Sequence, residues 1–253
     1  MGRRVMVFTL ALMLCGGLLA PPASAEWRPG TGRALRYIAT RSGNVSFAVK
    51  APGGALYSYE ARTKVPAASV LKVMFMTAYL RRFTRHQKLT EEDRSLLAPM
   101  IKRSDNYAAD RIADRLGPGP MYRLARLAGM RDFSYTRPWG LSTVSAYDQA
   151  RFMFHLEDYL PNRHEGYARY LLSHIVPEQR WGIGRVHRPN WKKFFKGGWG
   201  SGSGAVCHQV AFITHDGTRI SAAVMITSSP GHEYATETLR GVFKRLLRDL
   251  PES

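Results

Sequence analysis

The segment Ser69-Val70-Leu71-Lys72 holds a hydroxyl and an amine at a spacing that suits nucleophilic catalysis. It opens an apolar stretch that predicts a helix over 69–82. Because residues i and i+3 share a helical face, we expect the Lys72 amine about 3 Å from the Ser69 hydroxyl. Free N–H groups at the helix start would stabilise an oxyanion, and apolar neighbours would lower the lysine pKa so that it acts as a base. The pattern indicates a serine nucleophile, although S-x-x-K also arises by chance in a chain of this size.

A second candidate is Ser104-Asp105-Asn106, in a loop between two predicted helices. Its serine hydroxyl could relay a proton to a leaving group, and its asparagine amide could hold a substrate amide. The alternative is an N-cap, because Ser, Asp and Asn are the residues preferred just before a helix. Taken by itself, the segment favours the capping role.

The third candidate is Lys196-Gly197-Gly198-Trp199, at the end of a predicted strand. Lys196 places a cation at the rim of a site, and the two glycines let a substrate backbone approach the strand edge closely. The backbone N–H of Trp199 could serve as an oxyanion donor. The alternative is a flexible hairpin loop that carries an exposed lysine.

In their order and contexts, the three segments resemble the signature elements of the penicillin-recognising serine hydrolases, which include class A β-lactamases and D,D-peptidases. The resemblance is closest to the class A β-lactamases and covers nearly all of residues 26–253. It implies that Ser69 is the nucleophile of an acyl-enzyme, that Lys72 is its base and that Ser104 relays a proton.

The same resemblance implies how a substrate is held. Asn106 would bind the substrate amide and steady the lysine, and Lys196 would attract a carboxylate, with Gly198 beside them on the strand. The backbone N–H groups of Ser69 and Trp199 would form the oxyanion hole. The resemblance implies no cofactor and no metal.

One departure from the family pattern concerns deacylation. Class A β-lactamases carry a glutamate in an omega-loop E-x-x-L-N motif, which activates the water that releases the acyl group. The corresponding stretch here, residues 129–145, contains no glutamate, and its single acid is Asp132, to which we do not assign that role. We expect Asp148, Glu157 and Asp158, which follow on a predicted helix, to be solvated or paired. Without a placed base, an acyl-enzyme should hydrolyse slowly.

A second departure is Gly197, where the family usually has Thr or Ser. The missing hydroxyl removes one hydrogen bond to a substrate carboxylate, which weakens binding by roughly 1.5–3 kcal/mol without abolishing it. Ser201 or Ser203 would be the nearest substitutes in the sequence.

The pattern of elements predicts an α+β fold. Strand-like segments lie near both ends of the chain and helices lie between them, so the end strands must join one antiparallel sheet with a helical insertion. The family resemblance gives that sheet five strands. The expected strands are 44–50, 55–60, 191–196, 206–214 and 218–227, and the expected helices include 107–116, 119–128, 145–160, 163–175 and 232–250.

Residues 1–25 have the features of a secretory signal peptide: Arg3 and Arg4, an apolar run, and the cleavage site Ala23-Ser24-Ala25. Residues 26–253 then form the one hydrolase domain, and we expect it to be secreted, periplasmic or associated with the cell envelope. Export by the general or the twin-arginine route stays open.

Composition excludes several classes of protein. Among 253 residues, 45% are hydrophobic and 11% aromatic, which rules out a disordered chain. The 37 Lys+Arg against 19 Asp+Glu give a formal charge of +18, which favours anionic cell-wall polymers as partners. No nucleic-acid-binding motif accompanies the charge, so no nucleic acid is expected. We expect a monomer.

The leading hypothesis is an exported serine hydrolase or acyltransferase that forms an acyl-enzyme on Ser69 and deacylates slowly. Its substrate would be an amide with a nearby carboxylate, either a peptidoglycan stem peptide or a β-lactam. The first alternative is an ordinary β-lactamase that hydrolyses β-lactam antibiotics. The second is a catalytically silent envelope-binding protein on the same scaffold.

Overall fold

The computed structural model describes residues 27–200 and 205–250. Its centre is a five-stranded antiparallel sheet in the order β2-β1-β7-β6-β5, which confirms the predicted α+β class. Strands from the two ends of the chain lie side by side in it, since Phe47 pairs with Val224. The strands are β1 (Asn44–Lys50), β2 (Leu56–Tyr59), β5 (Lys192–Gly200), β6 (Val206–His215) and β7 (Thr218–Thr227).

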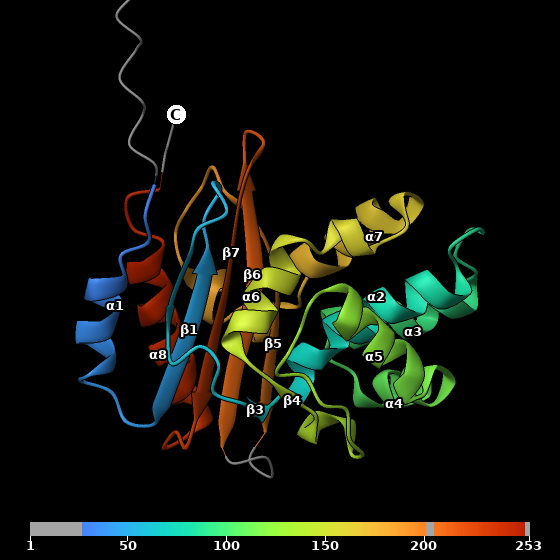
Figure 1. Ribbon diagram of the computed structural model, residues 1–253, viewed down its shortest axis with the longest axis horizontal. Helices are drawn as coiled ribbons and strands as arrows, with labels where there is room; N and C mark the ends of the chain where they lie inside the picture. Colours follow the sequence, from blue (N-terminus) through green and yellow to red (C-terminus); the bar gives the residue numbers. More distant parts are fainter. Residues whose placement is uncertain (1–26, 201–204, 251–253) are drawn as a thin grey trace, which may run out of the picture.

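Helices cover both faces of the sheet (Figure 1). Helices α1 (Thr31–Ile38) and α8 (His232–Leu246) lie on one face. The other helices lie on the opposite side: α2 (Leu71–Phe83), α3 (Glu91–Lys102), α4 (Asn106–Leu116), α5 (Pro118–Leu127), α6 (Ala146–Phe154) and α7 (Asn162–Ser173). A two-stranded ladder of β3 (Val65–Pro66) and β4 (Thr143–Val144) lies near the start of α2.

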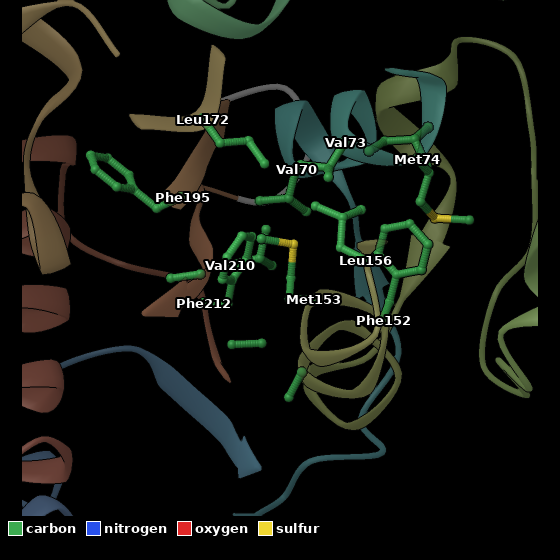
Figure 2. Close-up of a cluster of buried hydrophobic side chains, with 14 of the residues drawn as sticks. Val70, Val73, Met74, Phe152, Met153, Leu156, Leu172, Phe195, Val210 and Phe212 are labelled. Carbon is green, nitrogen blue, oxygen red and sulfur yellow. The ribbon is translucent and has the colours of Figure 1, made fainter. Parts of the chain in front are cut away.

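Helix α2 is the central element of the helical side. Every residue from Leu71 to Leu80 is buried, so this helix is enclosed on all its faces. Figure 2 shows how residues at its start meet α6 and the sheet, through Val70, Val73, Met74, Phe152, Met153, Leu156, Phe195, Val210 and Phe212. The dense packing holds α2 at a fixed distance from β5.

Several element boundaries differ from the sequence-based expectation. The helix expected over 145–160 ends at Phe154 and is followed by a separate turn, Glu157–Tyr159, because Glu157 turns to meet two arginines, Arg169 and Arg219. The strand expected over 191–196 continues to Gly200 because β6 pairs with it along its whole length. Helix α1 had no counterpart in the expectation.

The expected signal peptide over residues 1–25 lies outside the described residues, as do Ser201 and Ser203. Within residues 27–200 and 205–250, no helix has both the length and the apolar character needed to cross a membrane.

Candidate active site

Ser69 lies in a short 3-10 turn, Ala68–Val70, that leads directly into α2. The residue is 8% exposed, and the chain before it is anchored on two sides. The Ala67 N–H donates to Ser142 O at 2.7 Å, and His208 Nε2 donates to Pro66 O at 2.9 Å. The serine therefore sits at a rigid helix start, as the sequence predicts.

His208, which contacts the chain before Ser69, was not predicted from the sequence to lie near the site. It lies fully buried on β6, where its Nδ1 accepts the N–H of Ile226 at 3.1 Å. Because Nδ1 accepts, the proton of the neutral ring is on Nε2, which faces Pro66. Burial lowers the His208 pKa to about 4, so the ring stays neutral and keeps this orientation at neutral pH.

The Lys72 side chain is fully buried and reaches the loop before α4. Its Nζ donates to Ser104 O at 2.6 Å, to Asn106 Oδ1 at 2.8 Å and to Ser104 Oγ at 3.2 Å. Burial lowers the Lys72 pKa from 10.5 to about 7, although the charges of Asp105 and Asp110 act in the opposite direction. A large share of this amine is therefore neutral at pH 7.

The expected hydrogen bond between Lys72 and Ser69 is not formed. Within the described part of the chain, Ser69 Oγ makes no hydrogen bond, and the three acceptors of the Lys72 amine lie at 104 and 106 instead. An ammonium has three N–H donors, so these acceptors account for all of them. Deprotonation of Lys72 would free one position on Nζ for the serine proton.

Lys196 approaches the same point from β5. Its Nζ lies 2.9 Å from Ser104 Oγ and donates to Gly197 O at 2.7 Å. The side chain is fully buried, and burial together with the nearby Lys72 holds the Lys196 pKa well below its usual value. Ser104 Oγ thus lies between two amines, and its residue adopts a positive φ of 56°.

The segment 104–106 combines an N-cap with hydrogen bonds to the buried lysines. Asp105 is the N-cap of α4, because its Oδ1 accepts the N–H of Ala108 at 2.7 Å. The cap fixes the loop so that Ser104 and Asn106, on either side of Asp105, face the lysines. Capping of α4 and contact with the lysines are thus divided among consecutive residues.

Gly198 brings β5 against the turn that holds Ser69. A Cβ atom at position 198 would lie only 2.7 Å from the backbone nitrogens of both Ser69 and Val70. Only glycine allows this approach, which places the backbone of the next residue, Trp199, close to the start of α2. Oxyanion donation by the N–H groups of Ser69 and Trp199 stays a prediction.

Gly197 has a different steric reason for lacking a side chain. A Cβ at this position would lie 2.4 Å from Cη2 of Trp181, a buried residue. Gln209 fixes the loop of that tryptophan, because its Oε1 accepts the Ile183 N–H at 2.7 Å and its Nε2 donates to Trp181 O at 3.0 Å. Gly197, which stands where the family usually has Thr or Ser, therefore leaves room for the indole of Trp181.

Trp139 occupies the position next to Lys72 within the stretch that lacks the glutamate. Lys72 Nζ lies 5.0 Å from the centroid of the Trp139 ring. The indole Nε1 of Trp139 donates to Asp110 Oδ1 at 2.6 Å. Neither residue was assigned to the site from the sequence. The spacing of Asp110 four residues after Asn106, on the same helical face, was the signal that would have located it.

The four acids considered from the sequence make their contacts away from the cluster around Lys72. Asp132 accepts from Arg62 at 3.1 Å and from Ser145 Oγ at 2.9 Å. Asp148 is buried, which raises its pKa, and it accepts the Asp132 N–H at 2.7 Å. Glu157 pairs with Arg169 and Arg219. Asp158 pairs with His155.

Three aromatic rings form a wall beside the end of β5. Trp199, 37% exposed, meets Trp181 with ring centroids 6.0 Å apart, and His232 lies 5.5 Å from Trp199. The free thiol of Cys207 lies behind them, and burial raises its pKa to about 12. Cys207 is thus buried, and its thiol stays protonated at neutral pH.

In total, the structure joins Lys72, Ser104, Asn106 and Lys196 in one hydrogen-bonded cluster. The backbone of Ser69 is next to the same strand through Gly198. The arrangement supplies a serine at a helix start, a lysine with a pKa near neutrality and a hydroxyl shared by two amines. Such a set can transfer an acyl group to the serine and pass its proton onward.

Comparison with known proteins gives one family. A family model described as the beta-lactamase enzyme family matches residues 88–249. The matched range includes Ser104, Asn106 and Lys196 and begins after Ser69 and Lys72. No curated protein matches the chain.

Many solved structures share the fold. A beta-lactamase from Sphaerobacter thermophilus is 20% identical, with a TM-score of 0.74 over 88% of this chain and 98% of that chain. An ancestral class A beta-lactamase is 18% identical, with a TM-score of 0.74 over 86% and 98%. A beta lactamase from Xanthomonas campestris is 16% identical, with a TM-score of 0.73 over 87% and 97%. At these identities the likeness establishes the fold.

Proposed function

Since the chain belongs to the beta-lactamase enzyme family, we propose that it is a serine hydrolase that forms an acyl-enzyme on Ser69 with an amide substrate. The observation that carries this proposal is the buried amine of Lys72, whose pKa of about 7 lets it accept a proton near neutral pH. A lysine at its ordinary pKa would be almost wholly protonated under the same conditions.

Acylation would begin when neutral Lys72 takes the proton of the Ser69 hydroxyl as Oγ attacks the substrate carbonyl carbon. The tetrahedral oxyanion would be held by the N–H groups of Ser69 and Trp199. As the C–N bond breaks, the proton would pass from Lys72 to Ser104 Oγ while Ser104 gives its own proton to the leaving nitrogen. The 3.2 Å separation of Lys72 Nζ and Ser104 Oγ supports this relay.

The substrate would carry a carboxylate near the amide that reacts. An entering carboxylate would raise the lowered pKa of Lys196 and so generate a cation to pair with it. Asn106 would hold a substrate amide while remaining bonded to Lys72. A peptidoglycan stem peptide and a β-lactam both have this chemistry.

We propose slow deacylation because an indole, and not a carboxylate, faces Lys72 from residues 137–141. Asp110 is near enough for its charge to act on Lys72, but its Oδ1 already accepts the Trp139 N–H. An ordinary β-lactamase is the alternative function, and it would require an acid that activates water in the acyl-enzyme. The proposed place of action is outside the cytoplasm, where a formal charge of +18 suits an anionic wall.

The test is incubation of the protein with a reporter penicillin, followed by intact-mass measurement and by assay of the remaining drug. A stable adduct that is absent in Ser69→Ala and present in Ser95→Ala, a matched exposed serine, is the expected result. Rapid drug loss without an adduct would identify an ordinary β-lactamase. An absence of reaction with penicillin and with stem-peptide donors alike would favour the non-catalytic binding protein.

A further inference from the structure

A strongly cationic groove is lined by residues of α1 and α8 and by Arg188. Figure 1 shows that these two helices lie on the face of the sheet opposite to α2, the helix that follows Ser69. The volume of the groove is about 660 Å³. Three separate segments contribute its cations, which are Arg33, Arg36, Arg188, Lys244, Arg245 and Arg248. Among the described residues that line it, none is acidic.

Two of the guanidinium groups are held in place by neutral partners. Arg188 donates from Nε to Leu247 O at 2.8 Å and from Nη1 to His187 O at 2.7 Å. Arg245 lies over the ring of Tyr37, 3.9 Å from its centroid, and donates to a carbonyl of its own helix. These contacts orient both cations without neutralising their charge.

The remaining cations have little compensation. Asp249 pairs with Arg33 at 3.0 Å and approaches Arg248 at 3.5 Å, both near the surface. Arg36 and Lys244 are exposed and have no ion pair within residues 27–200 and 205–250. Like charges gathered in one groove repel each other, and an anionic occupant would offset that repulsion.

We propose that this groove binds a segment of a phosphate-bearing polymer. Guanidinium groups match the oxygen pairs of a phosphate in a bidentate manner, and Arg supplies five of the six cations. A hollow of about 660 Å³ along the seam of two helices has room for a polymer segment, a feature that binding to a planar lipid surface does not need. An interfacial membrane site also needs exposed apolar side chains, and on α1 only Leu35, 37% exposed, is of that kind.

The groove and the catalytic cluster lie on opposite faces of the sheet, so a bound polymer leaves the serine accessible. The groove would keep the enzyme on an anionic wall while the site acts on neighbouring chains. This inference does not depend on the acyl-enzyme proposal, because polymer binding is measured without turnover.

The test expresses the full chain and mixes the purified protein with a fluorescent poly(glycerol phosphate). Fluorescence anisotropy then measures binding at several salt concentrations. Arg36→Glu/Lys244→Glu should weaken binding at least about tenfold and reduce its dependence on salt. The matched control Arg123→Glu/Arg126→Glu changes the same charge on exposed residues of α5 and should alter binding less than about threefold. Circular dichroism establishes that both variants fold, and Arg36→Gln/Lys244→Gln provides a milder pair.

Equal losses in the two charge-reversed variants would overturn the proposal, because binding would then follow overall charge. A protein that binds phosphatidylglycerol vesicles but not the polymer would also overturn it, in favour of a lipid surface. Unchanged affinity in the groove variant would exclude the groove directly.

Discussion

The indole of Trp181 fills the space that any side chain at position 197 would need, since a Cβ on Gly197 would lie 2.4 Å from its Cη2. The two residues are therefore a matched pair: the bulk of one requires the absence of a side chain on the other. Gln209 maintains the pair by bonding the backbone of residues 181 and 183. This relationship accounts for a glycine at position 197, where the family usually has Thr or Ser.

Gly197→Thr should destabilise the protein by about 1–3 kcal/mol, because it overpacks a rigid region. In the Gly197→Thr background, Trp181→Ala should cost much less than it does in the natural sequence, since it removes the clash. Urea unfolding of the four proteins measures this coupling. Gly166→Ala, where the added methyl meets nothing within 4 Å, is the control. Additive effects of the two substitutions would contradict the pairing.

If Lys72 is the base of the proposed acylation, the rate of acylation should rise as pH increases through about 7, because only the neutral amine accepts a proton. Stopped-flow measurement with a chromogenic β-lactam gives the acylation rate between about pH 5.5 and 8.5. This range extends on the order of one pH unit beyond the Lys72 pKa on each side. Lys72→Met should reduce the rate at least about 100-fold at every pH. A rate that is flat across this range would exclude Lys72 as the group that titrates.

The same lysine should make stability depend on pH. Folding lowers the Lys72 pKa from 10.5 to about 7, so between these values the unfolded chain binds more protons than the folded one. Its contribution to the free energy of unfolding should therefore increase with pH, by up to about 1.4 kcal/mol per pH unit. Urea unfolding at pH 7 and pH 9 measures this, with Lys72→Met as the comparison and exposed Lys88→Met as the matched control. Equal slopes in all three proteins would contradict the shift.

Ser104→Ala should lower acylation by roughly 10²–10⁴-fold, which is the range for losing a general acid-base group. The carbonyl of residue 104 would still accept from Lys72, so the fold and the position of the lysine should be retained. The loss should be greatest for amides with poor leaving groups, which depend most on the relayed proton. Single-turnover kinetics with a series of leaving groups provides the measurement. An equal loss across the series would assign Ser104 a positioning role only.

The sequence allowed the antiparallel sheet and the order of the three motifs to be predicted, because hairpins and helix starts depend on local residue patterns. The capping role of the segment 104–106 was predictable from its residue types and is confirmed at Asp105, while the catalytic role of Ser104 stays a prediction. The contacts of Trp181 with Gly197 and of His208 with Pro66 were not predictable, because they join segments far apart in the chain. Hydrophobic periodicity shows which face of a helix or strand is buried, but not which distant segment packs against that face.

The direction of Lys72 shows the same limit at shorter range. Helical spacing places Lys72 on the side of Ser69, yet its amine bonds to Ser104 and Asn106. A long flexible side chain takes the strongest acceptors within reach, and these belong to a loop some thirty residues away. Sequence spacing predicted the shared location of the groups but not their hydrogen bonds.

The pairing of β1 with β7 has a consequence for biosynthesis. Asn44 lies opposite Thr227, so the middle of the sheet cannot close until the strand at 218–227 has emerged from the ribosome. Contacts of such long sequence separation slow folding. Completion of the sheet is therefore a late event in the synthesis of this chain.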